Sequence, residues 1–441
     1  MKKILFVYPK IEFEENYPNS WIPFSILTLA TSLKDKDVEV KIFDQNKHSI
    51  EEYKEYVVQN KDDLLCVAFS IMTGGAQIKN ALEMAKIAKN NNLTTVFGGP
   101  HVNVLPEQTA KHELVDYALK GMGQFQFPMF TDALIGKAKF EDVCGIYFYK
   151  GNKLIQGSEN IPKGLFLPGY DFSLIDIKDY IQNDNTINNK TINYIASQGC
   201  PYTCKFCYET CYKRKYFQIT EESIMQDIDY FFKIFNINGI KFYDADWFVN
   251  YKRSINLSKR MKNYNLKWAA SINPRDILRA QKGGVNELLE EISDSGCTRL
   301  LMGMESGNNR VLKDIVDKRV TKEELKYVAE LISKYKILGS YTFIVGFPNE
   351  TKKEIKDTLN FVKELWNLEY RPETRVHIYT PYPGTQLYGD ALELGFETPK
   401  NLEEWSKFDY YRSMTPWTDE SLEKDVRECT SMIEKKLVKQ K

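Results

Sequence analysis

The sequence predicts an α/β protein with a doubly wound N-terminal domain at residues 1–155, a partial barrel of six strand–helix units at 191–390 and a helical appendage at 391–441. Strand-like and helix-like patterns alternate in two separate series along the 441 residues. A stretch at 156–190 that is rich in Pro, Asn and Asp separates the two series and is predicted to be a linker. The hydrophobic fraction of 43% is typical of packed domains.

Short apolar runs in the first series are typical of buried parallel strands. Helical spacing of apolar residues between the third and fourth runs favours alternation of strands with helices. Two further runs flank Gly151-Asn152 and are predicted to form a hairpin. Ligands of such sheets bind beyond the carboxyl ends of the strands, so the loops there should line one site. The expected strands are Lys3–Tyr8, Val38–Phe43, Leu64–Phe69, Thr94–Phe97 and Asp116–Leu119, with Gly145–Tyr149 and Lys153–Ile155 as the hairpin.

The second series has the spacing of six consecutive βα units. Such units build a partial (β/α)6 barrel, in which the chemistry lies at the carboxyl ends of the strands. Helical patterns such as Thr220–Phe235 and Lys322–Lys336 separate the strands. The expected strands are Thr191–Ser197, Gly239–Tyr243, Lys267–Ser271, Thr298–Met302, Tyr341–Val345 and Arg375–Tyr379.

Charge and cysteine content argue against several classes of protein. Lys and Arg number 60 and Asp and Glu number 60, so no net charge attracts nucleic acid or an anionic membrane. No stretch approaches the roughly 18 apolar residues of a transmembrane helix, and the apolar run at the N-terminus stops at Pro9, too early for a signal peptide. Eight unevenly spaced cysteines do not form a disulfide framework. We expect a reduced, cytoplasmic protein with one metal site.

Three cysteines directly after the first strand of the barrel are the strongest chemical signal. Cys200, Cys204 and Cys207 lie in one loop at spacings of four and three, so their thiolates can converge on a soft metal centre. Three ligands rather than four leave one iron of a [4Fe–4S] cluster open to a substrate or cofactor. The alternatives are a structural zinc site, which usually has four ligands in paired CxxC sets, or unrelated buried cysteines. Cys211 could supply a fourth ligand, but its spacing carries it toward the following helix.

The CxxxCxxC spacing, with Phe206 and Tyr208 flanking the last cysteine, resembles the signature of the radical S-adenosylmethionine (SAM) superfamily. The resemblance implies that Cys200, Cys204 and Cys207 bind a [4Fe–4S] cluster. It further implies that the open iron chelates SAM and that one electron from the cluster cleaves it to a 5′-deoxyadenosyl radical.

Later strand ends carry segments that resemble those of the same superfamily, in the same order. Gly303-Met-Glu-Ser-Gly307 is similar to its GxESG segment, Phe343–Thr351 to its GxPxE-type motif, and Thr380–Thr385 to its TPYPGT turn. Glu305 could equally cap a helix, Glu350 could cap the next one, and the Asp and Arg positions could be solvated surface residues. The resemblance implies cofactor contacts at Phe206, Tyr208, Asp244, Ser271, Arg275, Glu305, Ser306 and Gly346, and catalytic roles for Asp246 and Tyr382.

The N-terminal domain is similar to the Rossmann-like cobalamin-binding domain that precedes the radical domain in one large subgroup. A generic domain of the same class would show the same strands, and Gly121-Met-Gly-Gln124 departs from the subgroup's usual GEGE form. None of the four histidines lies in an Asp-x-His-x-x-Gly motif, so we expect cobalt without histidine ligation, its lower face open or bound by water and next to the loop at Met72–Gly75. The implied cobalamin contacts are Ser70, Met72, Thr73, Gly74, Gly98, Gly99, His101, Gly121 and Gly123.

Together these resemblances imply a cobalamin-dependent radical SAM enzyme, class B methyltransferase-like, that methylates an unactivated carbon. One SAM would supply the methyl group through cobalamin, and a second would supply the radical that abstracts a substrate hydrogen. A rearrangement, cyclisation or ring contraction without methyl transfer is the alternative among enzymes, and a cobalamin-binding sensor or carrier with a structural cluster is the alternative outside them. We expect a small-molecule or lipid-like substrate, with a peptide as the alternative, and a flavodoxin or ferredoxin-type electron donor. The balanced charge does not favour a nucleic-acid substrate.

Overall fold

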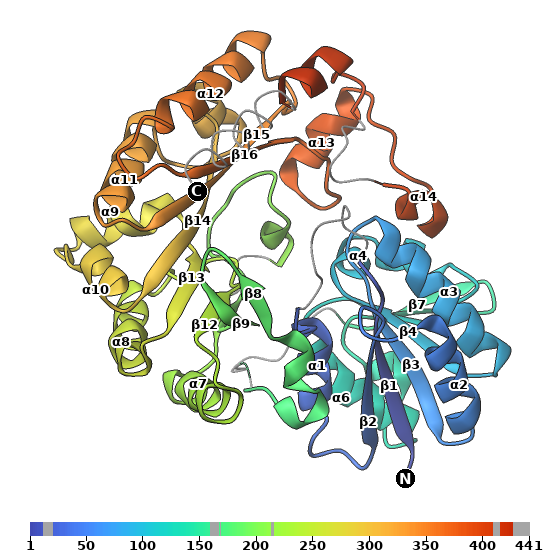
Figure 1. The fold of residues 1–441 in the computed structure, drawn as a ribbon. Coiled ribbons are helices and arrows are strands. Elements are labelled where there is room, and N and C mark those ends of the chain that lie inside the picture. The colour runs from blue at the N-terminus through green and yellow to red at the C-terminus, as the bar shows by residue number, and fades with distance from the viewer. Residues whose placement is uncertain (12–20, 159–166, 168, 213–215, 409–414, 427–441) are drawn as a thin grey trace. The chain divides into compact units, whose positions relative to one another are not determined.

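The computed structural model describes residues 1–11, 21–158, 167, 169–212, 216–408 and 415–426 (Figure 1). The contacts divide the chain into two compact units. The first unit contains Met1–Tyr180 and Thr398–Tyr410, and the second contains Ile181–Glu397 and Tyr411–Lys441. The return of Thr398–Tyr410 to the first unit is a feature that the predicted boundaries at 155, 190 and 390 do not contain.

The first unit is built on a seven-stranded sheet in the order β2-β1-β3-β4-β5-β6-β7. The first five strands are parallel, and β6 and β7 form the predicted antiparallel hairpin at the edge. The strands are β1 (Lys3–Tyr8), β2 (Glu39–Asp44), β3 (Leu64–Ser70), β4 (Thr94–Gly98), β5 (Tyr117–Leu119), β6 (Ile146–Lys150) and β7 (Lys153–Gln156).

Helices cover both faces of this sheet, which confirms the doubly wound prediction. Figure 1 shows α1 packed beside α6 on one side and α2 beside α3 on the other. Alternate residues of each strand serve the two faces, so Ile4 and Phe6 of β1 pack against α1 and α6. The helices are α1 (Phe24–Thr31), α2 (Ile50–Asn60), α3 (Ala76–Asn90), α4 (Pro100–Val104), α5 (Pro106–Ala110), α6 (Gly123–Leu134), η1 (Phe140–Asp142), η2 (Phe172–Leu174), η3 (Ile177–Tyr180) and α14 (Leu402–Ser406).

The second unit is a curved seven-stranded sheet in the order β16-β15-β14-β13-β12-β9-β8. Six strands are parallel and β8 pairs antiparallel with β9 at the edge, so the predicted six-strand partial barrel is confirmed. Each predicted strand is present with its ends shifted by a few residues. The strands are β8 (Gln182–Asp184), β9 (Asn188–Tyr194), β12 (Gly239–Phe242), β13 (Lys267–Ser271), β14 (Cys297–Glu305), β15 (Leu338–Val345) and β16 (Glu373–Ile378), and β10 (Ser197–Gln198) and β11 (Phe217–Gln218) form a separate pair.

Amphipathic helices cover the convex face of the curved sheet (Figure 1). Two of them, α11 and α12, begin with capping boxes in which Thr321 and Thr351 exchange hydrogen bonds with Glu324 and Glu354. Asn236 ends α7 in the left-handed conformation. The helices are η4 (Tyr208–Tyr212), α7 (Glu221–Phe235), α8 (Tyr251–Met261), η5 (Lys262–Tyr264), α9 (Pro274–Lys282), α10 (Leu288–Asp294), η6 (Val311–Ile315), α11 (Lys322–Lys334), α12 (Lys352–Leu365) and α13 (Gln386–Glu393).

The predicted helical appendage is only partly within the described residues. Helix α14 and residues 420–426 are helical, whereas 409–414 and 427–441 lie outside the part of the chain that the structure describes. Within the described residues, no helix is both long and apolar enough to cross a membrane.

Candidate functional site

The loop that carries Cys200, Cys204 and Cys207 is called the cysteine loop, and it begins where β9 ends. Asp244, which follows β12, contacts the start of this loop. The Asp244 carboxylate accepts hydrogen bonds from the Ala196 N–H (3.0 Å) and from the Ser197 hydroxyl (2.5 Å). Burial raises the pKa of Asp244 to about 6, and these hydrogen bonds act in the opposite direction. Asp244, predicted as a cofactor contact, therefore holds the start of the loop that carries the cysteines.

The three predicted cluster ligands line a single cavity of about 330 Å³ at the carboxyl ends of the barrel strands. Four other predicted site residues line it too, namely Phe206, Asp246, Ser271 and Glu305. The strands of the second unit therefore bring together residues that are more than a hundred positions apart in sequence. The remaining lining residues are Tyr202, Glu209, Thr210, Ala245, Ile272, Asn273, Leu301, Met302, Gly303, Lys318 and Thr342.

The donor set fits an iron–sulfur cluster better than a single metal ion. Among the described residues, no three His, Cys, Asp or Glu side chains are arranged to hold one ion, as a zinc site would require. A four-iron cluster needs separated thiolates, because each cysteine binds a different iron. Burial raises the pKa of Cys200, Cys204 and Cys207, so binding a cluster would release their protons. Cys211 is not among the lining residues, and its Sγ contacts the Pro383 carbonyl oxygen at 3.9 Å.

Glu305 reaches the cavity from the end of β14 in an unusual backbone conformation, with φ of +64°. Its carboxylate pairs with the Lys318 ammonium at 2.9 Å, and the two side chains are only 7% and 6% exposed. Burial alone would lower the pKa of Lys318, but the Glu305 carboxylate holds it above its usual range. Gly303 is needed beside this pair, because a Cβ at that position would clash with the Glu305 carboxylate.

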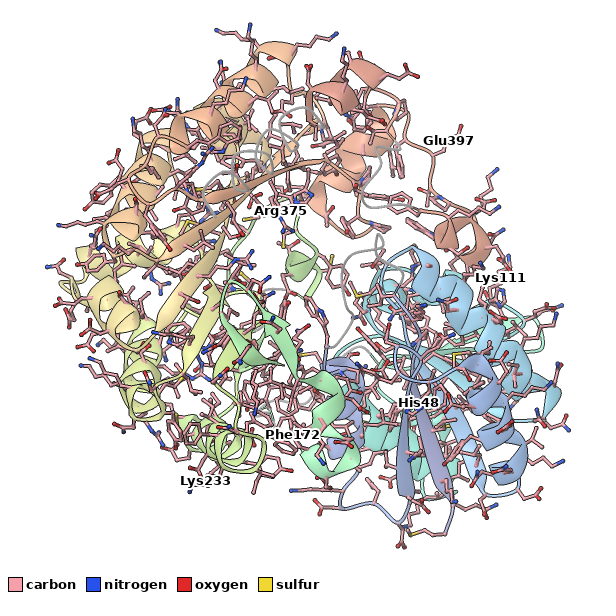
Figure 2. The ribbon with its side chains drawn as sticks, viewed as in Figure 1. His48, Lys111, Phe172, Lys233, Arg375 and Glu397 are labelled. Atoms are coloured by element: carbon pink, nitrogen blue, oxygen red, sulfur yellow. The ribbon has the colours of Figure 1, made fainter. Side chains whose placement is uncertain are left out.

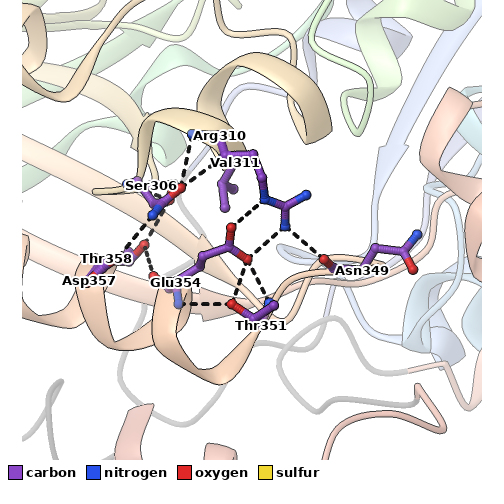
Figure 3. A network of polar contacts seen from close by, with 9 residues as sticks. Ser306, Arg310, Val311, Asn349, Thr351, Glu354, Asp357 and Thr358 are labelled. Carbon is purple, nitrogen blue, oxygen red and sulfur yellow. Dashed lines mark hydrogen bonds and ion pairs between the residues drawn. The ribbon is translucent and has the colours of Figure 1, made fainter.

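A polar network joins the segment that follows Glu305 to helix α12 (Figure 3). The Ser306 hydroxyl hydrogen-bonds Thr358 of α12 at 2.8 Å. Arg310 donates to both oxygens of Glu354, at 2.5 and 2.7 Å, and to the Asn349 carbonyl. The Arg310 guanidinium is the main reason why the pKa of Glu354 falls to about 2. Ser306, predicted as a cofactor contact, is thus tied to α12 and is fully buried.

A second cluster of charged groups lies at the ends of β12 and β13. Burial raises the pKa of Asp246, and the neighbouring Asp276 carboxylate raises it further. Asp276, at the start of α9, accepts a hydrogen bond from the Tyr202 hydroxyl. The Arg275 guanidinium stacks on the Tyr202 ring at 4.6 Å. Arg275, which was predicted as a cofactor contact, therefore packs against the cysteine loop.

In the loop after β15, the fifth parallel strand of the barrel, backbone groups form hydrogen bonds with side chains. Glu350 accepts hydrogen bonds from the N–H groups of Gly346 (2.6 Å) and Phe347 (3.0 Å), and burial raises its pKa to about 7. The Gly346 carbonyl accepts from the Trp417 indole at 3.0 Å. Tyr382 is half-buried in a turn whose carbonyl accepts from Thr385. Tyr208 opens the short helix η4. None of these predicted residues is among those lining the cavity.

In the first unit the predicted cobalamin contacts gather at the carboxyl ends of β3, β4 and β5. A Cβ at Gly99, where φ is +94°, would clash with Ile71 and Ser70, so glycine lets the two loops pack closely. Thr73 is 2% exposed, and its hydroxyl has no hydrogen-bond partner among the described residues. Met72, next to it, is 47% exposed. Gly74 and Gly121 lie in loops at these strand ends, Gly98 is the last residue of β4, and Gly123 is the first residue of α6.

His101 is placed differently from its neighbours in these loops. Its ring is fully buried and packs edge-on against Trp405 at 5.6 Å, and burial lowers its pKa to about 3. Within the described residues neither ring nitrogen has a hydrogen-bond partner. Trp405 comes from the returning segment, and its carbonyl accepts from the Gly75 N–H at 3.0 Å. The imidazole is therefore neutral and covered by protein. The close loop packing and the buried Thr73 hydroxyl without a partner fit a bound corrinoid tail at these strand ends.

Comparisons with known proteins match one family to the N-terminal part of the chain and another to the barrel. The radical SAM superfamily matches residues 194–362, and the B12 binding domain matches residues 15–128. An uncharacterized methyltransferase of Pyrococcus horikoshii is 26% identical over 97% of this chain and 91% of its own length. The anaerobic magnesium-protoporphyrin IX monomethyl ester cyclase of Rubrivivax gelatinosus is 24% identical over 89% of this chain and 71% of its own.

The solved structures show the same fold. The radical SAM methyltransferase TsrM from Kitasatospora setae, with tryptophan and a SAM analogue bound, superposes with a TM-score of 0.68 at 15% identity, covering 90% of this chain and 77% of that one. Both domains and the strand-end cysteines thus define an enzyme that uses a [4Fe–4S] cluster, SAM and cobalamin. The chain therefore combines a radical SAM domain with a B12-binding domain, and its relatives include cobalamin-dependent radical SAM methyltransferases.

Proposed function

We propose that this chain is a cobalamin-dependent C-methyltransferase that acts on an unactivated carbon of a small molecule. The observation that carries the proposal is the cavity in which three cysteines, Glu305 and Ser271 meet, in a chain that also has a B12-binding domain. The Pyrococcus horikoshii methyltransferase supports it, because the similarity runs through both domains. When bound, the cluster supplies the electron that cleaves SAM to a radical, and cobalamin carries the methyl group.

The chain's own residues have three tasks in this proposal. Cys200, Cys204 and Cys207 hold the cluster and leave one coordination site for SAM. Glu305, which is paired with Lys318, accepts hydrogen bonds from the ribose or ammonium of SAM. Ile272, Leu301 and Met302 supply apolar parts of the remaining wall, and they limit the access of water, which strengthens the polar contacts to SAM inside the cavity.

Asp246 is the residue that we propose to act nearest the chemistry, because it lines the cavity and is paired with Asp276. The raised pKa of Asp246 favours a protonated carboxyl there, which can donate a hydrogen bond to an anionic oxygen. Tyr382 remains a second proposed catalytic residue, supported by its position in the sixth-strand turn. A flavodoxin or ferredoxin-type protein would supply the electron, in the cytoplasm.

Cyclisation or rearrangement without methyl transfer is the second candidate. The Rubrivivax gelatinosus relative, named as a cyclase, favours it and aligns over 89% of this chain. Both candidates use radical cleavage of SAM, whereas a cobalamin-binding sensor or carrier has no use for it.

The first experiment therefore asks whether the reconstituted full-length chain cleaves SAM. With cluster, cobalamin and a strong reductant, the protein should form 5′-deoxyadenosine, measured by liquid chromatography with mass spectrometry. The matched control is the variant in which Cys200, Cys204 and Cys207 are all replaced by Ala. Equal formation of 5′-deoxyadenosine by both proteins, or none by the unmodified chain, would contradict the proposal and favour the sensor.

A further inference from the structure

Lys318 is a buried lysine that lines the cavity of the three predicted cluster cysteines. Figure 2 shows Lys233 at the outer surface of the second unit, where its side chain is 66% exposed. The Lys318 side chain is only 6% exposed. Among the described residues that line the cavity, Lys318 is the only one with a cationic side chain. A buried charge is costly, so an ammonium group at this place needs compensating negative charge.

The backbone turns sharply on both sides of Lys318. Asp317 and Arg319 have left-handed conformations, with φ of +55° and +57°, which residues other than glycine rarely adopt. Their side chains pair with each other at 2.9 Å and are 24% and 56% exposed, whereas the side chain of Lys318 between them is buried. Residues in such conformations are concentrated at functional sites. The segment thus places one ammonium group in the cavity although its backbone is strained on either side.

Hydrogen bonds join this segment to the cysteine loop on both sides of Cys204. The Thr203 hydroxyl donates to the Asp317 carboxylate at 2.5 Å. The Lys205 N–H donates to the Val316 carbonyl oxygen at 2.9 Å. Both neighbours of Cys204 are therefore bonded to the residues just before the buried lysine, and the thiol and the ammonium group line the same cavity.

The two charges of the Glu305–Lys318 pair act on Cys204 with opposite signs. Burial is the largest effect on the pKa of the Cys204 thiol and raises it; among the charged groups Lys318 acts most strongly and lowers it, and Glu305 raises it by less. The ammonium group therefore outweighs its partner at this sulfur atom. A cation that favours a thiolate also favours further negative charge at the same sulfur.

We propose that Lys318 sets the reduction potential of the [4Fe–4S] cluster and makes the cluster easier to reduce than burial in the cavity alone would allow. The oxidised [4Fe–4S]²⁺ core with three thiolates carries one net negative charge, and reduction to [4Fe–4S]⁺ adds a second. The electron comes from the flavodoxin or ferredoxin-type donor, which is oxidised by one electron, and no bond forms or breaks. Burial disfavours the added charge, and the Lys318 ammonium compensates for it.

Lys318 acts through the cluster in this inference and is therefore a positioning residue rather than a catalytic one. The inference rests on the proposed function only for the cluster at the three cysteines. It holds equally for methyl transfer and for cyclisation, because both begin with the reduced cluster.

The midpoint potential of the cluster tests this assignment. The reconstituted full-length holoenzyme, without SAM or substrate, is titrated anaerobically with dithionite through redox mediators, and the reduced cluster is measured by electron paramagnetic resonance. Lys318→Met should lower the ratio of reduced to oxidised cluster about tenfold at a fixed ambient potential, which is a shift of about 59 mV to more negative values. Lys318→Arg keeps the charge and should stay within about twofold of the unmodified chain.

Arg319→Met is the matched control, because it removes a cation at the next position. The guanidinium of Arg319 is exposed and screened by solvent, so this variant should change the ratio by less than about twofold. Because Lys318→Met is also destabilising, the double variant Glu305→Gln/Lys318→Met provides a second measurement without an unpaired buried charge. Its potential should lie between those of Lys318→Met and the unmodified chain, since the ammonium group outweighs the carboxylate at Cys204.

An unaltered potential in Lys318→Met, or equal shifts in Lys318→Met and Arg319→Met, would overturn the proposal. A shift in Lys318→Arg as large as that in Lys318→Met would show that packing rather than charge sets the potential, and would overturn it as well. If Lys318→Met binds no cluster, a double variant with the potential of the unmodified chain would overturn it. Failure of the proposed function would appear instead as a reducible cluster that does not cleave SAM, so the two failures are distinguishable.

Discussion

The buried ion pair between Glu305 and Lys318 gives a quantitative prediction for Lys318→Met. The replacement keeps the length and apolar stem of the side chain but leaves the Glu305 carboxylate buried without its cation. Removing one partner of a buried pair costs about 3–5 kcal/mol, because the remaining charge is uncompensated. For a domain of the size of the second unit, about 2–4 °C per kcal/mol gives a decrease in Tm of roughly 6–20 °C.

A neighbouring pair provides the matched control. Arg319 contacts Asp317 at 2.9 Å, but its side chain is 56% exposed, so Arg319→Met should change the stability little. The double variant Glu305→Gln/Lys318→Met removes both charges and should recover most of the lost stability, but not the binding of SAM.

Thermal unfolding of the reconstituted chain followed by circular dichroism, together with equilibrium dialysis of SAM, measures both effects. The reasoning is refuted if Lys318→Met is no more destabilising than Arg319→Met, or if the double variant is as unstable as the single one. Unchanged SAM binding in the double variant would show that Glu305 does not contact SAM.

Three further predictions concern the ligands and the network behind the cavity. Cys204→Ala should abolish the absorbance of the cluster near 400 nm, whereas Cys211→Ala should retain it, and equal loss in both would make Cys211 a ligand. His101→Ala should leave the visible spectrum of bound cobalamin unaltered, because the covered and neutral imidazole is not a cobalt ligand; a spectral change in this variant would contradict the expectation. Arg310→Gln should cost about 1 kcal/mol at pH 7, and the difference should shrink as the pH falls below about 4.5 and be lost near pH 2, where Glu354 protonates in the folded state. A difference in the denaturation midpoint that persists unchanged at pH 3 would show that the pair is not its cause.

The sequence was sufficient for the elements of the fold because local patterns determine them. Most strands of the two sheets are apolar runs with buried side chains, and the predicted ranges match to within a few residues, whereas the polar edge strand β8 was not predicted. The strand-end position of the three cysteines placed them in one cavity without further information. The return of Thr398–Tyr410 to the first unit was not predictable in the same way, because the contacts of Trp405 with Gly75 and His101 join residues about 300 positions apart.

The parts of the site that were missed depend on tertiary contacts. Lys318 lies in an ordinary Asp-Lys-Arg run, and only the folded chain shows that it is buried against Glu305. Asp276 follows Asn-Pro-Arg and has the sequence context of a helix start, so its pairing with Asp246 had no sequence signal. Asp244, Arg275 and Ser306 were predicted as cofactor contacts from their position at strand ends. In the structure their side chains hold neighbouring segments in place, and their contacts with a cofactor stay a prediction.

Product stoichiometry tests methyl transfer most directly. Under turnover with the true substrate, each methylated product should be accompanied by one S-adenosylhomocysteine and about one 5′-deoxyadenosine, because one SAM donates its methyl group and a second is cleaved to the radical. Mass spectrometry with SAM deuterated in its methyl group should show three deuterium atoms in the product. Formation of 5′-deoxyadenosine and product with neither S-adenosylhomocysteine nor label in the product would contradict methyl transfer and establish a cyclisation or rearrangement instead.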